Sequence, residues 1–128
     1  MKIHHIAISV KDLEKSVFFY KENFGFKEID RFTKPGWTGE AVVLLLGDVR
    51  LEIFCFKDYI DNKNEVGNLK TIGINHFGIE VDSVLDKYKE FKNKGIDIDE
   101  PVEGKTCAYF CFLRDTDGIS IELYENKK

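Results

Sequence analysis

Two histidines and two glutamates stand at corresponding places in two similar stretches of the sequence. His5 lies in HHIAISV and His76 in NHFGIEV, while Glu52 follows His5 by 47 residues and Glu122 follows His76 by 46 residues. Two imidazoles and two carboxylates form a ligand set suited to zinc, nickel, cobalt, manganese or ferrous iron, with positions left for water or substrate. A single His or Glu on a strand is usually a solvated surface residue, but the repeated spacing predicts one catalytic divalent metal site with these four ligands.

Strand alternation places all four side chains on equivalent faces. The opposite faces of the two histidine-bearing strands are apolar, and helices would pack on them. These faces consist of Ile6, Ile8 and Val10 in the first strand and of Phe77, Ile79 and Val81 in the second. The ligand face is expected to be a concavity partly lined by Phe54, Phe56 and Tyr124. A carboxylate beside aromatic rings is costly unless a bound cation compensates it, which supports the metal interpretation.

The elements that position these residues occur twice. Leu13, Val17, Tyr20 and Phe24 form a helical stripe between Asp12 and Gly25, and Val84, Tyr88 and Phe91 repeat it between Asp82/Ser83 and Gly95. Strand-like runs cover 27–32, 41–46 and 50–56, and then 96–99, 107–113 and 119–125. The sequence therefore predicts an α+β fold: one domain, 1–128, of two βαβββ modules, about 1–56 and 73–125, joined by a polar linker, 57–72.

Length and charge exclude several classes of protein. The 128 residues suffice to bury a core without disulfides or structural zinc. The net charge of −4, with Lys and Asp/Glu interspersed, leaves no basic face for nucleic acid and no anchor for an acidic membrane. The N-terminal stretch has too short an apolar run for a signal peptide or a membrane span, so we expect a cytoplasmic protein with a small-molecule substrate.

With this order of His, Glu, His and Glu on βαβββ units, the chain resembles the glyoxalase I branch of the vicinal oxygen chelate (VOC) superfamily over essentially its whole length, from HHIAISV to DGISIELYE. The resemblance implies a curved mixed sheet in which two modules form a cup around one divalent metal, such as nickel, zinc or cobalt. It also implies a homodimer with shared sites, in which His5 and Glu52 would meet the partner's His76 and the partner's Glu122.

The resemblance also implies an activity. Glyoxalase I, the lactoylglutathione lyase of methylglyoxal detoxification, isomerises the hemithioacetal of a 2-oxoaldehyde and a thiol through an enediolate. On this analogy Glu122 is the preferred base, with Glu52 nearly as plausible. Ser9 and Phe56 stand where glutathione-using bacterial enzymes often carry an arginine and an asparagine, so the expected glutathione contacts are missing.

Other functions of the same fold remain open. A methylmalonyl-CoA epimerase-like enzyme would typically have glutamine in place of Glu52. A ring-cleaving dioxygenase or a fosfomycin-type thiol transferase would use three protein ligands. A metal-free drug-binding protein of the bleomycin resistance type would lack the quartet.

Several further residues have structural interpretations. Cys55, Cys107 and Cys111 lie in apolar runs and are expected to be reduced thiols in the core, with Cys107 and Cys111 too far apart on a strand to chelate one metal. His4 is expected on the opposite strand face and Trp37 in a packing or dimer contact. Ser9 and Glu80 are expected at the rim of the ligand face.

Overall fold

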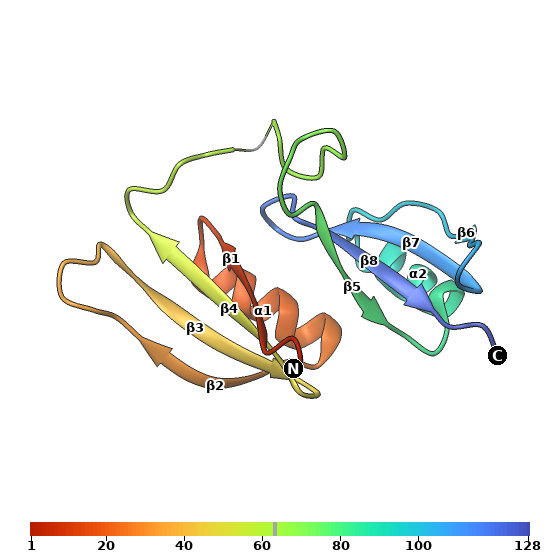
Figure 1. Cartoon of the computed structure of the whole chain (residues 1–128), viewed down its shortest axis with the longest axis horizontal. Coiled ribbons are helices and arrows are strands. Elements are labelled where there is room, and N and C mark those ends of the chain that lie inside the picture. Colours follow the sequence, from red (N-terminus) through yellow and green to blue (C-terminus); the bar gives the residue numbers. More distant parts are fainter. Residues whose placement is uncertain (63) are drawn as a thin grey trace. The chain divides into compact units, whose positions relative to one another are not determined.

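A computed structural model describes residues 1–62 and 64–128 (Figure 1). The chain divides into two compact units, Met1–Asp61 and Asn62–Lys128, and each contains one βαβββ module. The α+β class and the repeated module predicted from the sequence are confirmed. No helix in the described part of the chain combines the length and apolar character that crossing a membrane requires.

The first module is a four-stranded mixed sheet covered by one helix. Its elements are β1 (His5–Ser9), α1 (Leu13–Phe24), β2 (Lys27–Phe32), β3 (Gly39–Leu46) and β4 (Val49–Phe56). The strand order is β1-β4-β3-β2; β1 pairs with β4 in parallel, and the other pairs are antiparallel. The first and last strands of the module are therefore neighbours.

The second module repeats this plan with a shorter edge. It comprises β5 (His76–Glu80), α2 (Val84–Asn93), β6 (Val102–Glu103), β7 (Tyr109–Arg114) and β8 (Ser120–Glu125), in the order β5-β8-β7-β6. The prediction of a strand at 96–99 is wrong, since this stretch makes one isolated bridge, from Ile98 to Leu113. Pro101, which has no N–H to donate, follows it, and the paired edge strand resumes only at Val102.

The helix ends are as the sequence predicts. The Asp12 side chain accepts a hydrogen bond from the backbone N–H of Lys15 (3.1 Å), and Ser83 caps α2 through the N–H of Asp86 (3.2 Å). Gly25 ends α1 with φ = 76°, a left-handed conformation that costs glycine little, and its N–H donates to the carbonyl of Lys21. These caps fix where each helix turns back toward the sheet.

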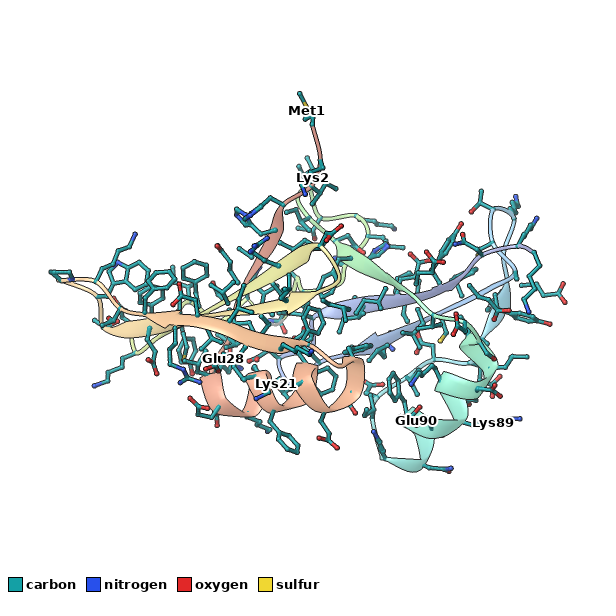
Figure 2. All side chains as sticks on the ribbon, turned by 90° about the horizontal axis from the view of Figure 1, so that it is seen from below. Met1, Lys2, Lys21, Glu28, Lys89 and Glu90 are labelled. Carbon is teal, nitrogen blue, oxygen red and sulfur yellow. The ribbon has the colours of Figure 1, made fainter. Side chains whose placement is uncertain are left out.

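One face of each sheet packs on its helix. Val17 and Tyr20 of α1 are buried with Leu44 and Ile53 of the sheet. In the second module Val84 and Phe91 of α2 are buried with Leu123. Figure 2 shows Lys21 on α1 and Lys89 and Glu90 on α2 at the outer surfaces of the helices, where all three are exposed. Each module therefore leaves the second face of its sheet free of a helix.

The cysteines are free thiols, and two of them belong to the core as expected. Cys107 and Cys111 are buried, whereas Cys55 is half-buried and its Sγ lies 3.5 Å from the carbonyl oxygen of Lys11. Burial raises the pKa of the Cys111 thiol to about 11, with smaller contributions from the charges of Asp99 and Glu122. Cys111 therefore has little thiolate at neutral pH and acts as a small apolar side chain.

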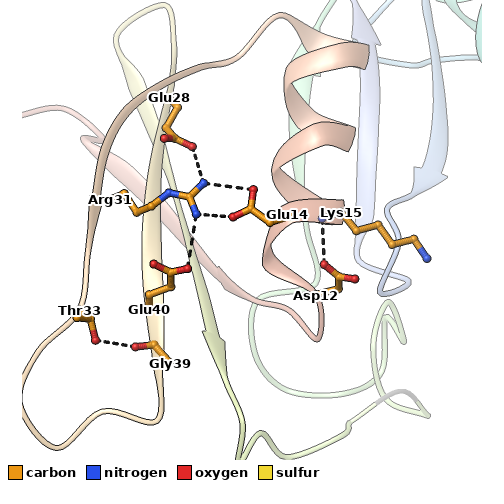
Figure 3. Close-up of polar contacts among 8 residues, drawn as sticks. All are labelled: Asp12, Glu14, Lys15, Glu28, Arg31, Thr33, Gly39 and Glu40. Atoms are coloured by element: carbon orange, nitrogen blue, oxygen red, sulfur yellow. Dashed lines mark hydrogen bonds and ion pairs between the residues drawn. The ribbon is translucent and has the colours of Figure 1, made fainter.

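Arg31 joins α1 to the sheet of the first module (Figure 3). Its guanidinium makes an ion pair with Glu14 at the start of α1, donates to Glu28 at 2.9 Å and lies 3.5 Å from Glu40. The hydrogen bond to Glu14 is the main reason that the pKa of Arg31 is raised, and it lowers the pKa of the Glu14 carboxyl from its usual 4.5. One cation thus connects the helix to two neighbouring strands.

Replacing Arg31 by glutamine is expected to lower the free energy of unfolding by roughly 0.5–1 kcal/mol at neutral pH, because partly exposed ion pairs contribute this much. The Glu14 pKa is lower in the folded state, so its contribution is present above 4.5 and is lost as the pH falls through the folded value. The difference between wild type and Arg31→Gln in urea unfolding should therefore shrink at acidic pH. Lys15→Gln, on the same helix, is the control; a pH-independent difference would contradict the ion-pair account.

Candidate functional site

The four predicted metal ligands lie in two pairs, and strand register explains both. In the parallel ladder of β1 with β4, Ala7 is opposite Glu52, and His5 precedes Ala7 by two residues. In the ladder of β5 with β8, Gly78 is opposite Glu122, and His76 precedes Gly78 by two residues. Residues two apart share a strand face, so each histidine lies diagonally beside its glutamate on the face away from the helix. The two modules have the same register.

The distances within the pairs are short. The Nε2 atom of His5 is 3.7 Å from Oε2 of Glu52, and the Nε2 atom of His76 is 3.2 Å from Oε2 of Glu122. The glutamate side chains are 25% and 22% exposed and the histidines 46% and 28% exposed, in the same order. The pair in the second module is thus the closer and the more shielded from solvent. We refer to the two pairs as half-sites.

Asn75 holds the ring of His76 from its other side. Oδ1 of Asn75 lies 2.8 Å from Nδ1 of His76, so a proton on Nδ1 would be donated to the amide oxygen. A neutral imidazole carries one N–H, and with its proton on Nδ1 the lone pair of Nε2 faces the Glu122 carboxylate. Two lone-pair donors directed at each other are stabilised by a positive charge between them, which a proton or a metal ion can supply.

His4 occupies the same position in the first module as Asn75 in the second. Its Nδ1 is 3.0 Å from Nδ1 of His5, and the two rings meet edge to face with centroids 5.3 Å apart. β1 begins only at His5, so His4 lies before the strand and contacts the proposed ligand directly. His4 was predicted on the opposite strand face and instead touches His5 from outside the strand. No role was predicted for Asn75, although it precedes His76 as His4 precedes His5.

Aromatic side chains border both half-sites. In the second module the ring of Phe112, whose residue is opposite Glu122 in the ladder, meets His76 edge to face at 4.9 Å. Phe110 packs against Phe112 at 6.1 Å. Tyr124, predicted to line the concavity, lies opposite Phe110 and donates its hydroxyl to the carbonyl of Thr106 at 3.0 Å. Phe110 and Phe112 were not predicted from the sequence, although they alternate with buried Cys111 and Leu113.

The first module has a different aromatic border. Trp37, from the loop between β2 and β3, packs against Phe56 with centroids 5.0 Å apart and against Phe54 at 6.0 Å. Phe54 and Phe56 were predicted to share the face of Glu52, and their rings are nearly parallel, with an interplanar angle of 8°. The predicted packing role of Trp37 is thus confirmed, and all three rings remain half-buried.

Each half-site supplies one imidazole nitrogen and one carboxylate oxygen, which suits a divalent ion but is too few ligands to hold it alone. Within residues 1–62 and 64–128, no group of three or more His, Cys, Asp or Glu side chains is placed to bind a metal. Ser9 and Glu80, expected at the rim of the ligand face, are exposed. The chemistry of the donors therefore suits a divalent metal ion, but each His/Glu pair provides only part of the ligands that such an ion needs.

Comparisons with known proteins agree with this fold. Residues 2–123 match the family model described as Glyoxalase/Bleomycin resistance protein/Dioxygenase superfamily. The "Uncharacterized protein YwkD" of Bacillus subtilis (strain 168) is 31% identical, with 96% of this chain and 95% of the relative covered. Human mitochondrial methylmalonyl-CoA epimerase is 28% identical, with 95% of this chain and 72% of the relative covered. Lactoylglutathione lyase of Escherichia coli O157:H7 is 26% identical, with 99% of this chain and 94% of the relative covered.

A solved structure shows the same architecture. The crystal structure of SMU.1112c is 29% identical and superposes with a TM-score of 0.82 over 98% of both chains. A family model that spans nearly the whole chain, two βαβββ modules and a relative above 30% identity lead to one assignment. The chain belongs to the Glyoxalase/Bleomycin resistance protein/Dioxygenase superfamily, whose members include enzymes and often bind metal.

Proposed function

We propose that the protein is a metal-dependent lyase/isomerase of the glyoxalase I type, which converts the hemithioacetal of a 2-oxoaldehyde and a thiol into a 2-hydroxyacyl thioester. The observation that carries the proposal is the pair of His/Glu half-sites in the same register on equivalent faces of the two modules. Two such half-sites provide two imidazoles and two carboxylates, the donor set expected for a catalytic divalent ion.

His5, Glu52, His76 and Glu122 would hold the ion, with nickel, zinc and cobalt all compatible with these donors. When bound, a divalent ion supplies positive charge that orients vicinal substrate oxygens and stabilises the negative charge of an enediolate. The half-buried position of both glutamates strengthens charge interactions by limiting solvent access.

Glu122 is the proposed base. Its carboxylate would remove the proton from the carbon that bears sulfur and return it to the adjacent carbon, so the reaction is an internal redox isomerisation that needs no further reactant. His76 adjoins this carboxylate at 3.2 Å, and Asn75 keeps the ring oriented through Nδ1. Glu52 is the alternative base, since its position in the first module is equivalent.

We also propose that the sites are shared in a homodimer. Each half-site alone has two donors, and the resemblance to the glyoxalase I branch implies that His5 and Glu52 of one chain join the partner's His76 and the partner's Glu122. Such a dimer would complete two sites from four half-sites. The dimer contact would then be a requirement for catalysis. The cellular role proposed for the enzyme is cytoplasmic detoxification of a 2-oxoaldehyde.

Two other functions of the same fold are the alternatives. The 28% identity to human methylmalonyl-CoA epimerase favours an epimerase of a CoA ester, a reaction that also transfers a proton beside metal-held oxygens. Glu52 argues against it, because that group typically has glutamine there. A metal-free binding protein of the bleomycin resistance type shares the fold, and the presence of a His/Glu pair in both modules argues against it.

The Glu122→Gln variant is expected to lose at least about 100-fold in turnover, the contribution typical of a positioned base, while it keeps much of its metal binding. Nickel- and zinc-loaded protein should be assayed with methylglyoxal and several thiols, including glutathione, and with a CoA-ester epimerisation assay in parallel. Glu22→Gln, an exposed position on α1, is the control.

Undiminished turnover of Glu122→Gln would refute the base assignment. Failure with every thiol combined with epimerase activity would replace the lyase by the alternative. Absence of metal from protein purified without chelator, and no binding of added nickel or zinc, would rule out both enzymes.

Shared sites predict complementation between two inactive chains. The His5→Ala/Glu52→Ala chain and the His76→Ala/Glu122→Ala chain should each be inactive, but when co-expressed they should form mixed dimers with one site built from unsubstituted half-sites. Random pairing would restore about a quarter of wild-type activity, because half of the dimers are mixed and each keeps one of its two sites. No recovery, with mixed dimers verified by differential tags, would place each site within one chain.

Asn75 is predicted to set the tautomer of His76. In the metal-free protein the neutral His76 ring should carry its proton on Nδ1, and Asn75→Leu should shift it to Nε2, where Glu122 is then the available acceptor. Long-range proton–nitrogen NMR correlation measures this directly, and the chain's other histidines, His4 and His5, serve as references. Because a proton on Nε2 competes with the metal, metal affinity should fall by about 10- to 100-fold. An unchanged tautomer would contradict this role.

A further inference from the structure

The half-buried rings of Trp37, Phe54 and Phe56, here called the aromatic corner, pack on one another beside the first half-site. Phe54 and Phe56 are nearly parallel, and the Trp37 ring is inclined to them by 58° and 66°. The surfaces of these rings that stay exposed can be met by a further flat ring, face-on or edge-on. All three rings keep part of their surface exposed.

The aromatic corner adjoins the first half-site. Glu52, Phe54 and Phe56 alternate along β4 and so share the face away from α1. Successive positions on one strand face are separated by ~7 Å, which is the length of a small ring-bearing substrate. A molecule whose reacting atoms lie at Glu52 would therefore extend its remaining part onto Phe54, Phe56 and Trp37.

Small residues lie beside the rings on the neighbouring strand. Gly39 and Ala41 of β3 are opposite Phe56 and Phe54, so no large side chain of β3 competes with Trp37 for the surface of these rings. The position equivalent to Ala41 in the second module is Phe110, opposite Tyr124. The His/Glu pair is thus repeated in both modules, but the Trp37 arrangement belongs to the first alone, as expected of a feature that selects a substrate.

Lys34 places a positive charge at the edge of the aromatic corner. Its Nζ lies 5.4 Å from the ring centroid of Trp37 and 5.8 Å from that of Phe32, and the side chain is exposed. Among the described residues Lys34 has no carboxylate partner, whereas Arg31 nearby in sequence is paired with Glu14 and Glu28. An ammonium group held over aromatic faces and free to pair is complementary to an anionic group on a bound ring.

We propose that the aromatic corner and Lys34 form a binding subsite for a planar aromatic ring that carries an anionic group. This inference names the substrate class of the proposed enzyme and so rests on the proposed function. The ring lies against Phe54, Phe56 and Trp37, the anion pairs with Nζ of Lys34, and the reacting end extends toward Glu52.

The chain itself supplies the reporter for a test, because Trp37 is its single tryptophan. Titration of the metal-free full chain with phenylacetate, followed by tryptophan emission, should show saturable binding with a Kd in the millimolar range, as expected for a fragment. Cyclohexylacetate, which has the charge but no aromatic ring, should bind about 5-fold more weakly. Phenylacetamide, which has the ring but no charge, should bind about 3-fold more weakly.

Matched variants separate the two parts of the subsite. Lys34→Met should abolish the preference for phenylacetate over phenylacetamide and keep the preference for the aromatic ring, whereas Lys21→Met on α1 should change neither. Phe56→Leu should reduce the aromatic preference, and Phe18→Leu, an exposed phenylalanine on α1, should not. Circular dichroism verifies that each variant is folded.

The absence of a saturable change in Trp37 emission, or equal affinity for the phenyl and cyclohexyl acids, would overturn the proposal. So would emission that depends on protein concentration and not on ligand, since a second copy of the chain would then cover the rings. The assay needs neither metal nor turnover, so its failure is distinguishable from failure of the proposed lyase activity. Phenylacetate binding by a chain that fails every lyase and epimerase assay described above would reject the enzyme and leave a binding subsite.

Discussion

The parallel pairing of the first strand with the last strand of each module is the contact on which the candidate site depends. It places His5 beside Glu52 and His76 beside Glu122, although each pair is separated by more than forty residues of chain. The helix and the two intervening strands form the connection that such a parallel pair requires. Their packing secures the register, and a shift of one residue would move the histidine to the helix-covered face.

Much of this could be predicted because it is local. Asp12 and Gly25 mark the ends of α1 through backbone chemistry that one turn of sequence contains, and strand alternation puts His5 and Glu52 on equivalent faces. The contact of Phe112 with His76 could not be predicted in the same way, since it depends on the cross-strand register of β7 with β8. The 96–99 stretch misled for a related reason: alternation suggests a strand, and pairing decides whether one forms.

The two modules show how a repeated framework can carry unequal surroundings. The His/Glu geometry is preserved, yet the residue before each histidine is His4 in one case and Asn75 in the other. An amide oxygen can only accept a hydrogen bond from a ring nitrogen, whereas a second imidazole can donate or accept one. The half-sites therefore share donors and differ in how firmly each ring is oriented, with His76 the better fixed and the less exposed.

Both histidines lie on outermost strands of their own sheets. β1 and β5 have five residues each, and within its module each is hydrogen-bonded along one side, to β4 or β8. Detaching one short strand would separate a histidine from its glutamate without unpairing the other three strands of the sheet. The ligand pairs therefore depend directly on the pairing of an edge strand. A metal ion that binds both residues of a pair, or a partner that covers the edge strand, would also stabilise the pairing of that strand with its neighbour.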